Sequence, residues 1–157
     1  MQTITLIALG KLNADYYAKA AAEYAKRLSA YCRLNIVELP EEPIAEKNAS
    51  PAVIGKALEK EARAILTAVP KGSSLAALCV EGKQKTSEEL AAYLDERAGS
   101  GAGDVAFVIG LADSVKQTAS LRLSMSKMTF PHQLARVMLL EQLYRAFSIN
   151  HGGKYHK

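Results

Sequence analysis

The chain has 157 residues, 49% of them hydrophobic and 23% charged, with a formal net charge of +4. This length predicts one domain spanning residues 1–157, and no apolar run approaches the roughly 20 residues of a membrane span. The opening MQTITLIALG lacks the basic start, longer apolar run and cleavage site of a signal peptide. A cytosolic protein without contact to a membrane is therefore expected.

The N-terminal part predicts a strand, a helix and a second strand. Residues 3–9, TITLIAL, read as the first strand, which a glycine closes. Asn13 or Asp15 can then cap a helix that runs to about residue 31, because its apolar residues fall at helical spacing. Residues 34–39, LNIVEL, read as the second strand, which a proline ends.

The middle of the chain repeats this alternation. Ser50 and Pro51 are typical of a helix start, which predicts a helix to about residue 69. Residues 75–80, LAALCV, form a continuous apolar run, as in a strand that is covered on both faces. The spacing Thr-x-x-Glu that begins at Thr86 predicts a capped third helix.

The fold class follows from these alternations together with a further buried strand at residues 105–109, VAFVI. Four strand-then-helix units predict an α/β fold, with a mostly parallel sheet and helices on both faces. Ligands of such sheets bind outside the carboxyl ends of the strands. Three segments are therefore candidates for a site: residues 78–82, residues 109–110, and KMTFPHQLAR at residues 127–136, which joins an apolar strand to a helix.

The helix expected over about residues 133–147 is apolar around most of its circumference. Such a helix needs cover on more than one side. Two interpretations are open: it is a central core helix of the subunit, or one side meets the same helix of a second subunit in a homodimer.

Basic residues are concentrated near the C-terminus. Residues 116–157 hold seven lysines and arginines against one acid, and all three histidines. This asymmetry favours a polyanion partner such as nucleic acid, although a solvated basic face is the common alternative. Cys32 and Cys79 show no metal-ligand spacing, so they read as buried thiols and no metal site is expected.

Several motifs together give a resemblance that covers essentially the whole chain. They are TITLIALGKL, EYAKRL, LCVEGK, AFVIG and, most specifically, the closing combination of TFPHQ, EQLYRA and YHK. The sequence resembles the RlmH family of bacterial rRNA methyltransferases, which belongs to the SPOUT class. The resemblance implies an α/β fold with a C-terminal trefoil knot, a homodimer, and methylation of N3 of a pseudouridine in 23S rRNA on the assembled ribosome. The methyl donor that it implies is S-adenosyl-L-methionine.

The resemblance also assigns roles to residues. It implies a cofactor pocket made by Leu78, Gly110, Met125, Ser126, Lys127, Met128, Thr129 and Phe130. Without it, the methionines and the phenylalanine of this set would read as plain core. The candidate catalytic residues are His132, Tyr155 and His156. N3 of pseudouridine must lose a proton, and histidine titrates near neutral pH. Tyr155 and His156 are favoured for handling the substrate and His132 for shaping the site, and the identity of the base is left open.

Contacts to RNA are expected from basic side chains near these residues, namely Arg136, Arg145 and Lys154. Arg136 and Arg145 can hold phosphates, or they can pair with Glu141 across a dimer. Tyr155 can stack on the target base or form a hydrogen bond with it. The two glycines at residues 152 and 153 predict a flexible tail.

One segment departs from the family pattern. After VAFVIG the family usually continues with a turn of the form Gly-x-x-Gly, whereas here Gly110 is followed directly by LADSV. About four residues are therefore missing beside the expected pocket. Either the loop is genuinely deleted, which would shorten the site beside the donor methyl group, or the sequence omits a loop that the natural chain contains. The second alternative is favoured, because the other family motifs are all retained. This departure leaves an alternative function open, a non-catalytic ribosome-binding dimer that has lost the cofactor. A different small-molecule enzyme is a third option, but no GxGxxG or P-loop motif supports it.

Overall fold

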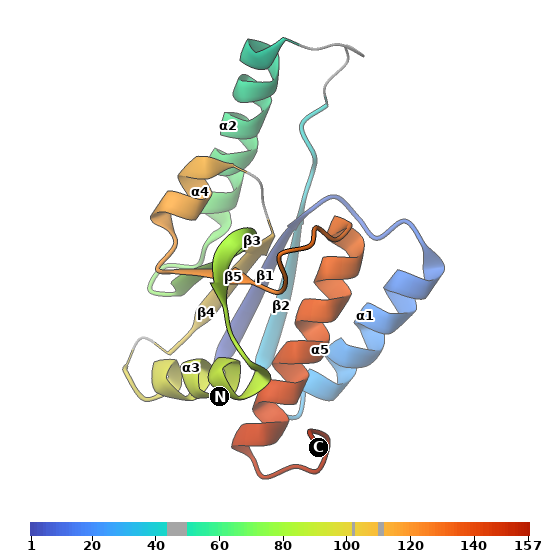
Figure 1. The fold of residues 1–157 in the computed structure, drawn as a ribbon, viewed down its shortest axis with the longest axis vertical. Coiled ribbons are helices and arrows are strands. Elements are labelled where there is room, and N and C mark those ends of the chain that lie inside the picture. The colour runs from blue at the N-terminus through green and yellow to red at the C-terminus, as the bar shows by residue number, and fades with distance from the viewer. Residues whose placement is uncertain (44–49, 102, 110–111) are drawn as a thin grey trace.

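The computed structural model describes residues 1–157 except residues 44–49, 102, 110 and 111. Strands and helices alternate along the chain (Figure 1). The elements are β1 (Thr3–Leu9), α1 (Asp15–Leu28), β2 (Arg33–Leu39), α2 (Pro51–Ala68), β3 (Ser74–Gln84), α3 (Ser87–Ala98), β4 (Val105–Ile109), α4 (Asp113–Thr118), β5 (Leu121–Ser124) and α5 (His132–Asn150).

The five strands form one sheet in the order β2-β1-β4-β3-β5, and every neighbouring pair is parallel. Helices α1, α3 and α5 pack on one face, and α2 and α4 lie on the other (Figure 1). Because every strand runs in the same direction, the carboxyl ends of all five lie at one edge of the sheet. The predicted α/β architecture is thus confirmed, with a sheet that is parallel throughout.

Each face of the sheet has its own hydrophobic core. Phe107 of the central strand β4 and Ile4 of β1 are fully buried against α1, α3 and α5. Val108, the next residue of β4, points to the opposite side and packs with Ile65 of α2 and Val115 of α4. This alternation explains why all five residues of β4 are apolar and buried.

Two of the three predicted helix caps are confirmed. The side chain of Ser50 accepts a hydrogen bond from the backbone of Val53, and Thr86 forms a reciprocal capping box with Glu89. The prediction that Asn13 or Asp15 caps α1 is wrong, because the cap residue is Ala14, which offers no side-chain acceptor. Helix α1 also ends at Leu28 rather than near residue 31.

Helix α5 is a central helix of the subunit. It packs against both α1 and α3, and its fully buried residues include Leu139, Leu140 and Leu143. It starts one residue earlier and ends three residues later than the sequence predicted. These contacts support the interpretation as a core helix. They leave the homodimer as a proposal.

The long strand β3 crosses closely over β5. Its first half pairs with β5 up to Leu78 opposite Leu123, and after a register shift Lys83 lies opposite the same Leu123. A Cβ atom on Gly82 would lie 2.8 Å from the backbone carbonyl carbons of Arg122 and Leu123. Only glycine therefore permits this crossing.

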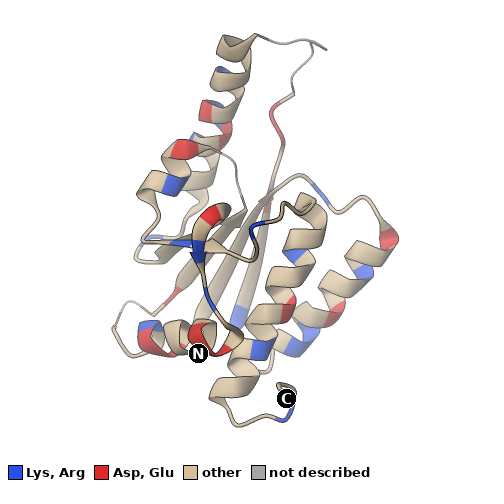
Figure 2. Cartoon of the chain, in the orientation of Figure 1, with Lys and Arg blue, Asp and Glu red and all other residues tan. Residues whose placement is uncertain are grey.

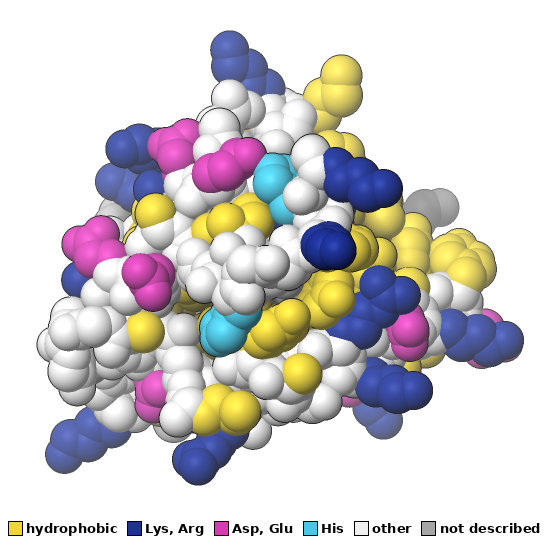
Figure 3. Space-filling view, turned by 90° about the horizontal axis from the view of Figure 1, so that it is seen from below, with side chains coloured by type: hydrophobic (Ala, Val, Ile, Leu, Met, Phe, Trp, Pro, Cys, Tyr) yellow, Lys and Arg dark blue, Asp and Glu magenta, His cyan; other side chains and the backbone are white. Residues whose placement is uncertain are grey.

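Three of the seven basic residues of the last quarter pair with carboxylates inside the subunit. Lys116 pairs with Glu81, Arg136 with Glu38, and Arg145 with Glu141. Acidic and basic positions are interspersed along the helices (Figure 2). The face seen from below carries lysines and arginines at its edge and on one side of an apolar patch, with acidic and histidine side chains on the same face (Figure 3). Within the described ranges, no helix has the length and apolarity to span a bilayer.

Candidate cofactor pocket and C-terminal cluster

A pocket lies at the carboxyl end of β4 and beside residues 78–81 of β3, where β3 stops pairing with β4. This is one of the places where the strand order predicted a ligand. The remaining walls of the pocket come from α4, from the segment between β5 and α5, and from the first turns of α5. The lining residues are Leu78, Cys79, Val80, Glu81, Ile109, Lys116, Met125, Ser126, Met128, Thr129, Phe130, His132 and Ala135.

Most of the residues expected to bind the cofactor meet at this pocket. Those that line it are Leu78, Met125, Ser126, Met128, Thr129 and Phe130. The side chain of Lys127 is exposed and does not line the pocket. Gly110, the eighth expected residue, lies outside the described residues, as does Leu111, where the departure from the family pattern falls.

The segment that follows β5 is held in a tight turn by two serines, Ser124 at the end of the strand and Ser126 within the segment. Ser124 donates a hydrogen bond from its hydroxyl to the carbonyl of Ser126 at 2.9 Å. The hydroxyl of Ser126 accepts one from the backbone of Met128 at 3.0 Å. These bonds hold the backbone against the pocket, while the Met128 side chain stays 74% exposed at its mouth. His132 begins α5 and is exposed at the pocket's edge.

Lys116 and Glu81 form an ion pair in the pocket wall. The ammonium of Lys116 donates to the carboxylate of Glu81 at 2.5 Å. This hydrogen bond lowers the pKa of Glu81 and raises the pKa of Lys116. Sequence reasoning missed Lys116, because a single lysine in a short helix belongs to no motif. It included Glu81 only as a member of the segment 78–82.

The cysteines take different positions. Cys32 is buried just before β2, and burial raises the pKa of its thiol to about 11. Cys79 is half-buried in the pocket wall, where burial and the nearby Glu81 raise the pKa of its thiol. Both thiols therefore remain protonated at neutral pH. Among the described residues, no group of three or more His, Cys, Asp or Glu side chains is placed to hold a metal ion.

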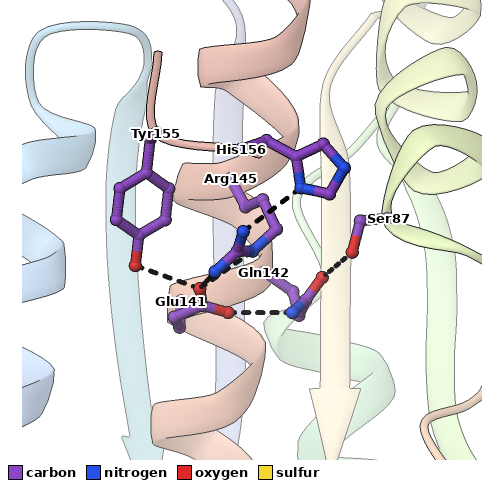
Figure 4. A network of polar contacts seen from close by, with 6 residues as sticks. All are labelled: Ser87, Glu141, Gln142, Arg145, Tyr155 and His156. Carbon is purple, nitrogen blue, oxygen red and sulfur yellow. Dashed lines mark hydrogen bonds and ion pairs between the residues drawn. The ribbon is translucent and has the colours of Figure 1, made fainter. Parts of the chain in front are cut away.

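The C-terminal tail folds back on α5 and forms a polar cluster (Figure 4). The hydroxyl of Tyr155 donates to Glu141 at 3.1 Å, and the guanidinium of Arg145 lies 4.7 Å from the centre of the Tyr155 ring. Arg145 also pairs with Glu141 and contacts Nδ1 of His156 at 3.2 Å. On its other side, Nε2 of His156 lies 2.6 Å from the carboxylate of Glu88 in α3.

A tight turn holds the tail in this position. The backbone of Gly153 donates to the carbonyl of Ser148 at 2.7 Å, and a Cβ atom there would lie 2.3 Å from the Ser148 hydroxyl. Lys154, the next residue, is exposed. The glycines that predicted a flexible tail thus permit a close turn, which brings Tyr155 and His156 onto α5.

The phenol of Tyr155 is a weak acid in this cluster. Burial raises its pKa most, and the hydrogen bond to the carboxylate of Glu141 adds to the shift, giving a pKa of about 12. Tyr155 therefore keeps its proton throughout the neutral range. It can donate a hydrogen bond, but it cannot act as a base near pH 7.

Arg136 does not fit the expected contact with an RNA phosphate. Its side chain is only 4% exposed, and its guanidinium donates to Glu38 at 2.5 Å and to the carbonyl of Gly10 at 2.9 Å. It does not pair with Glu141 within the subunit, whereas Arg145 does. Arg136 thus ties α5 to β2 and to the end of β1. No local pattern could indicate these contacts, because the two partners lie 98 and 126 residues away along the chain.

Within one subunit, the pocket and the tail cluster are far apart. His132 lies at the first turn of α5 and Arg145 lies 13 residues later, which corresponds to about 20 Å along the helix. The expected catalytic residues therefore fall into two groups. His132 lies at the pocket, and Tyr155 and His156 lie in the tail cluster.

Two comparisons with known proteins match nearly the whole length of this chain. A family model described as "Predicted SPOUT methyltransferase" matches residues 1–156. Proteins of Bacillus thuringiensis (strain Al Hakam) and Bacillus anthracis, each named "Ribosomal RNA large subunit methyltransferase H", are 48% identical to this chain. The alignments cover 98% of this chain and 99% of each relative.

The lengths in these alignments bear on the departure from the family pattern. Each alignment has 158 positions, whereas 98% of the 157 residues is about 154. About four positions therefore face a gap in this chain, which agrees in number with the residues missing after Gly110.

Proposed function

The chain belongs to the SPOUT methyltransferase family, and on this premise we propose that it methylates the RNA of the large ribosomal subunit. The donor in this proposal is S-adenosyl-L-methionine, and the acceptor is N3 of a pseudouridine in 23S rRNA on the assembled ribosome. Residues 1–157 act as a single SPOUT domain. The names of the relatives support the ribosomal RNA substrate. The motifs TFPHQ, EQLYRA and YHK support the finer assignment.

The observation that carries the proposal is the pocket at the end of β4 and beside residues 78–81 of β3. Leu78, Met125 and Phe130 are half-buried in its lining and provide the apolar walls that an adenine ring requires. The bound donor supplies an electrophilic methyl group on a sulfonium. The task of the protein is to hold that methyl group and the acceptor nitrogen in line, because orientation lowers the barrier of a two-molecule reaction.

Proton removal from N3 falls to the histidines. His132 stands exposed at the edge of the pocket, and His156 contacts both a carboxylate and a guanidinium. Tyr155, which keeps its proton, orients the target nucleobase by a hydrogen bond or by stacking. Arg145 and Lys154 lie with the tail and contact the RNA backbone in this proposal.

The distance between the pocket and the tail supports a homodimer with shared sites. About 20 Å of α5 separates the pocket from the tail cluster, so one subunit alone does not bring the cofactor pocket and the tail residues to the same nucleobase. In the homodimer we propose, the tail of one subunit serves the pocket of the other. The crossing of β3 over β5 at Gly82 is likewise compatible with a trefoil knot near the pocket, which is part of the proposal.

Labelled methyl transfer tests the function. Purified protein is incubated with S-adenosylmethionine carrying a labelled methyl group and with ribosomes from a strain that lacks the modification. We expect label on a single pseudouridine of 23S rRNA, and much less label when protein-free rRNA replaces the ribosomes. Label on another nucleotide would contradict the assigned acceptor.

A non-catalytic ribosome-binding dimer is the second candidate. The gap of about four positions in the alignments favours it, since these residues are expected beside the pocket. In the same assay such a protein would bind ribosomes and transfer no label. It would also fail to bind S-adenosylhomocysteine, the demethylated product.

A further inference from the structure

Two charged side chains from different elements meet in the pocket wall. Glu81 comes from the last part of β3 and Lys116 from α4, and their charged groups lie 2.5 Å apart. Among the lining residues that the structure describes, they are the only acid and the only lysine or arginine. The rest of the lining is apolar apart from the thiol of Cys79, two hydroxyl side chains and His132.

Both charges persist at neutral pH. The hydrogen bond lowers the pKa of Glu81 and raises the pKa of Lys116, so the two groups are fully ionised. The Lys116 side chain is 16% exposed, whereas Glu81 is 56% exposed. Asp113, the other acid near Lys116, is 4.0 Å away and 89% exposed, so it does not line the pocket. The pocket therefore presents one covered cation and one more accessible anion side by side.

We propose that this pair binds the zwitterionic amino-acid end of the methyl donor. The ammonium of Lys116 pairs with the donor's α-carboxylate, and the carboxylate of Glu81 accepts hydrogen bonds from its α-ammonium. This assignment rests on the proposed function and deepens it, because it names the groups that recognise the charged end of the cofactor.

The chemistry of that end explains why such a pair is needed. An α-amino acid carries opposite charges a few ångströms apart, and both lose water when they enter a pocket. An apolar lining provides no interaction that offsets this cost of desolvation. A preformed pair of opposite charges receives the zwitterion by exchanging one ion pair for two, so that no charge is left without a partner.

Comparing two ligands distinguishes recognition of the amino-acid end from a change in the structure of the whole pocket. S-adenosylhomocysteine and 5′-methylthioadenosine share the adenosine and a neutral sulfur, but only the first carries the amino-acid end. Binding of both is measured by calorimetry on the full chain. The proteins compared are the wild type, Lys116→Met, Lys116→Arg and, as a matched control in α4, Asp113→Asn.

We expect Lys116→Met to weaken S-adenosylhomocysteine binding by about tenfold or more, the usual effect of losing a charge-assisted hydrogen bond. Binding of 5′-methylthioadenosine should change by less than about twofold, since it makes no contact with the charged pair. Lys116→Arg should retain most of the preference for S-adenosylhomocysteine. Asp113→Asn should bind both ligands as the wild type does.

Other outcomes overturn the inference. An equal loss of both ligands in Lys116→Met would show that the pair only holds α4 in place, and unchanged binding of both would show that it has no role. In either case a wild type that binds S-adenosylhomocysteine and methylates rRNA leaves the proposed function intact. A wild type that binds neither ligand contradicts the cofactor assignment, and this inference with it.

Discussion

Individual charged side chains in this protein gain their roles from burial and from the partners they meet. Arg136 is the clearest example, because its guanidinium is covered and its Nε atom has no hydrogen-bond partner among the described residues. Its charge depends on Glu38 and on the carbonyl of Gly10. Losing one partner of such a pair is costly, since the remaining charge stays away from water.

The pair between Arg136 and Glu38 should therefore matter for stability. Glu38→Gln removes the negative charge at nearly constant size and is expected to lower the free energy of unfolding by about 2 kcal/mol. The matched control is Glu23→Gln, which breaks the exposed pair with Arg27 and should cost less than about 0.5 kcal/mol. Urea denaturation measures both. Equal effects of the two substitutions would refute the role assigned to Arg136.

The raised pKa of Tyr155 predicts a specific dependence of stability on pH. The folded state holds the phenolic proton up to a pKa of about 12, whereas the unfolded chain releases it near the ordinary value of about 10. The stabilisation is thus complete below pH 10 and is lost as the pH rises from 10 to 12. The difference in unfolding free energy between wild type and Tyr155→Phe should shrink over this interval. A constant difference would contradict the shift.

At the scale of elements, the crossing of β3 over β5 is the feature most sensitive to a small change. The backbone of β5 occupies the space where a side chain at residue 82 would begin. Backbone atoms cannot move aside as a flexible side chain can. The order of the elements around the pocket therefore depends on a glycine at this position.

Gly82→Ala is expected to destabilise the protein by at least about 2 kcal/mol, because the added methyl group forces the two segments apart. Gly55→Ala in the second turn of α2 is the control, since nothing lies within 4 Å of its new methyl group. It should stabilise the protein by up to about 1 kcal/mol through helix propensity. Thermal unfolding compares the two. A tolerated Gly82→Ala would show that β3 and β5 do not approach so closely.

Local sequence patterns account for much of the fold but not for its pairings. The apolar runs of β3 and β4 and the caps at Ser50 and Thr86 depend on neighbouring residues, so they could be predicted. The start of α1 could not be predicted, because the cap position is occupied by Ala14, which lies between the two polar candidates Asn13 and Asp15. The pocket's location followed from strand direction, whereas the pairs of Arg136 with Glu38 and Lys116 with Glu81 join distant residues that no local pattern connects.

At the scale of the whole molecule, the pocket and the tail divide the work between binding and catalysis. A chain truncated after Gly153 loses Tyr155, His156 and Lys154 but keeps every described residue of the pocket lining. We expect it to bind S-adenosylhomocysteine within about twofold of the wild type, because no residue of the subunit's own tail lines the pocket and the partner's tail is proposed to handle the RNA rather than the cofactor. Methylation of ribosomes should fall by at least about 100-fold, as is usual when acid–base and substrate-positioning groups are lost. Full activity of the truncated chain would remove the tail from the mechanism.

The proposed shared site is tested most directly by mixing two inactive variants and measuring methyl transfer to ribosomes. One variant is truncated after Gly153, and the other is Met128→Glu, which places a charge at the mouth of the pocket on an exposed residue and so leaves the fold intact. If each tail serves the partner's pocket, a one-to-one mixture regains about a quarter of the wild-type activity, since half of the dimers are mixed and each has one complete site. Absence of activity, with subunit exchange shown independently, would contradict a methyltransferase site shared between two subunits.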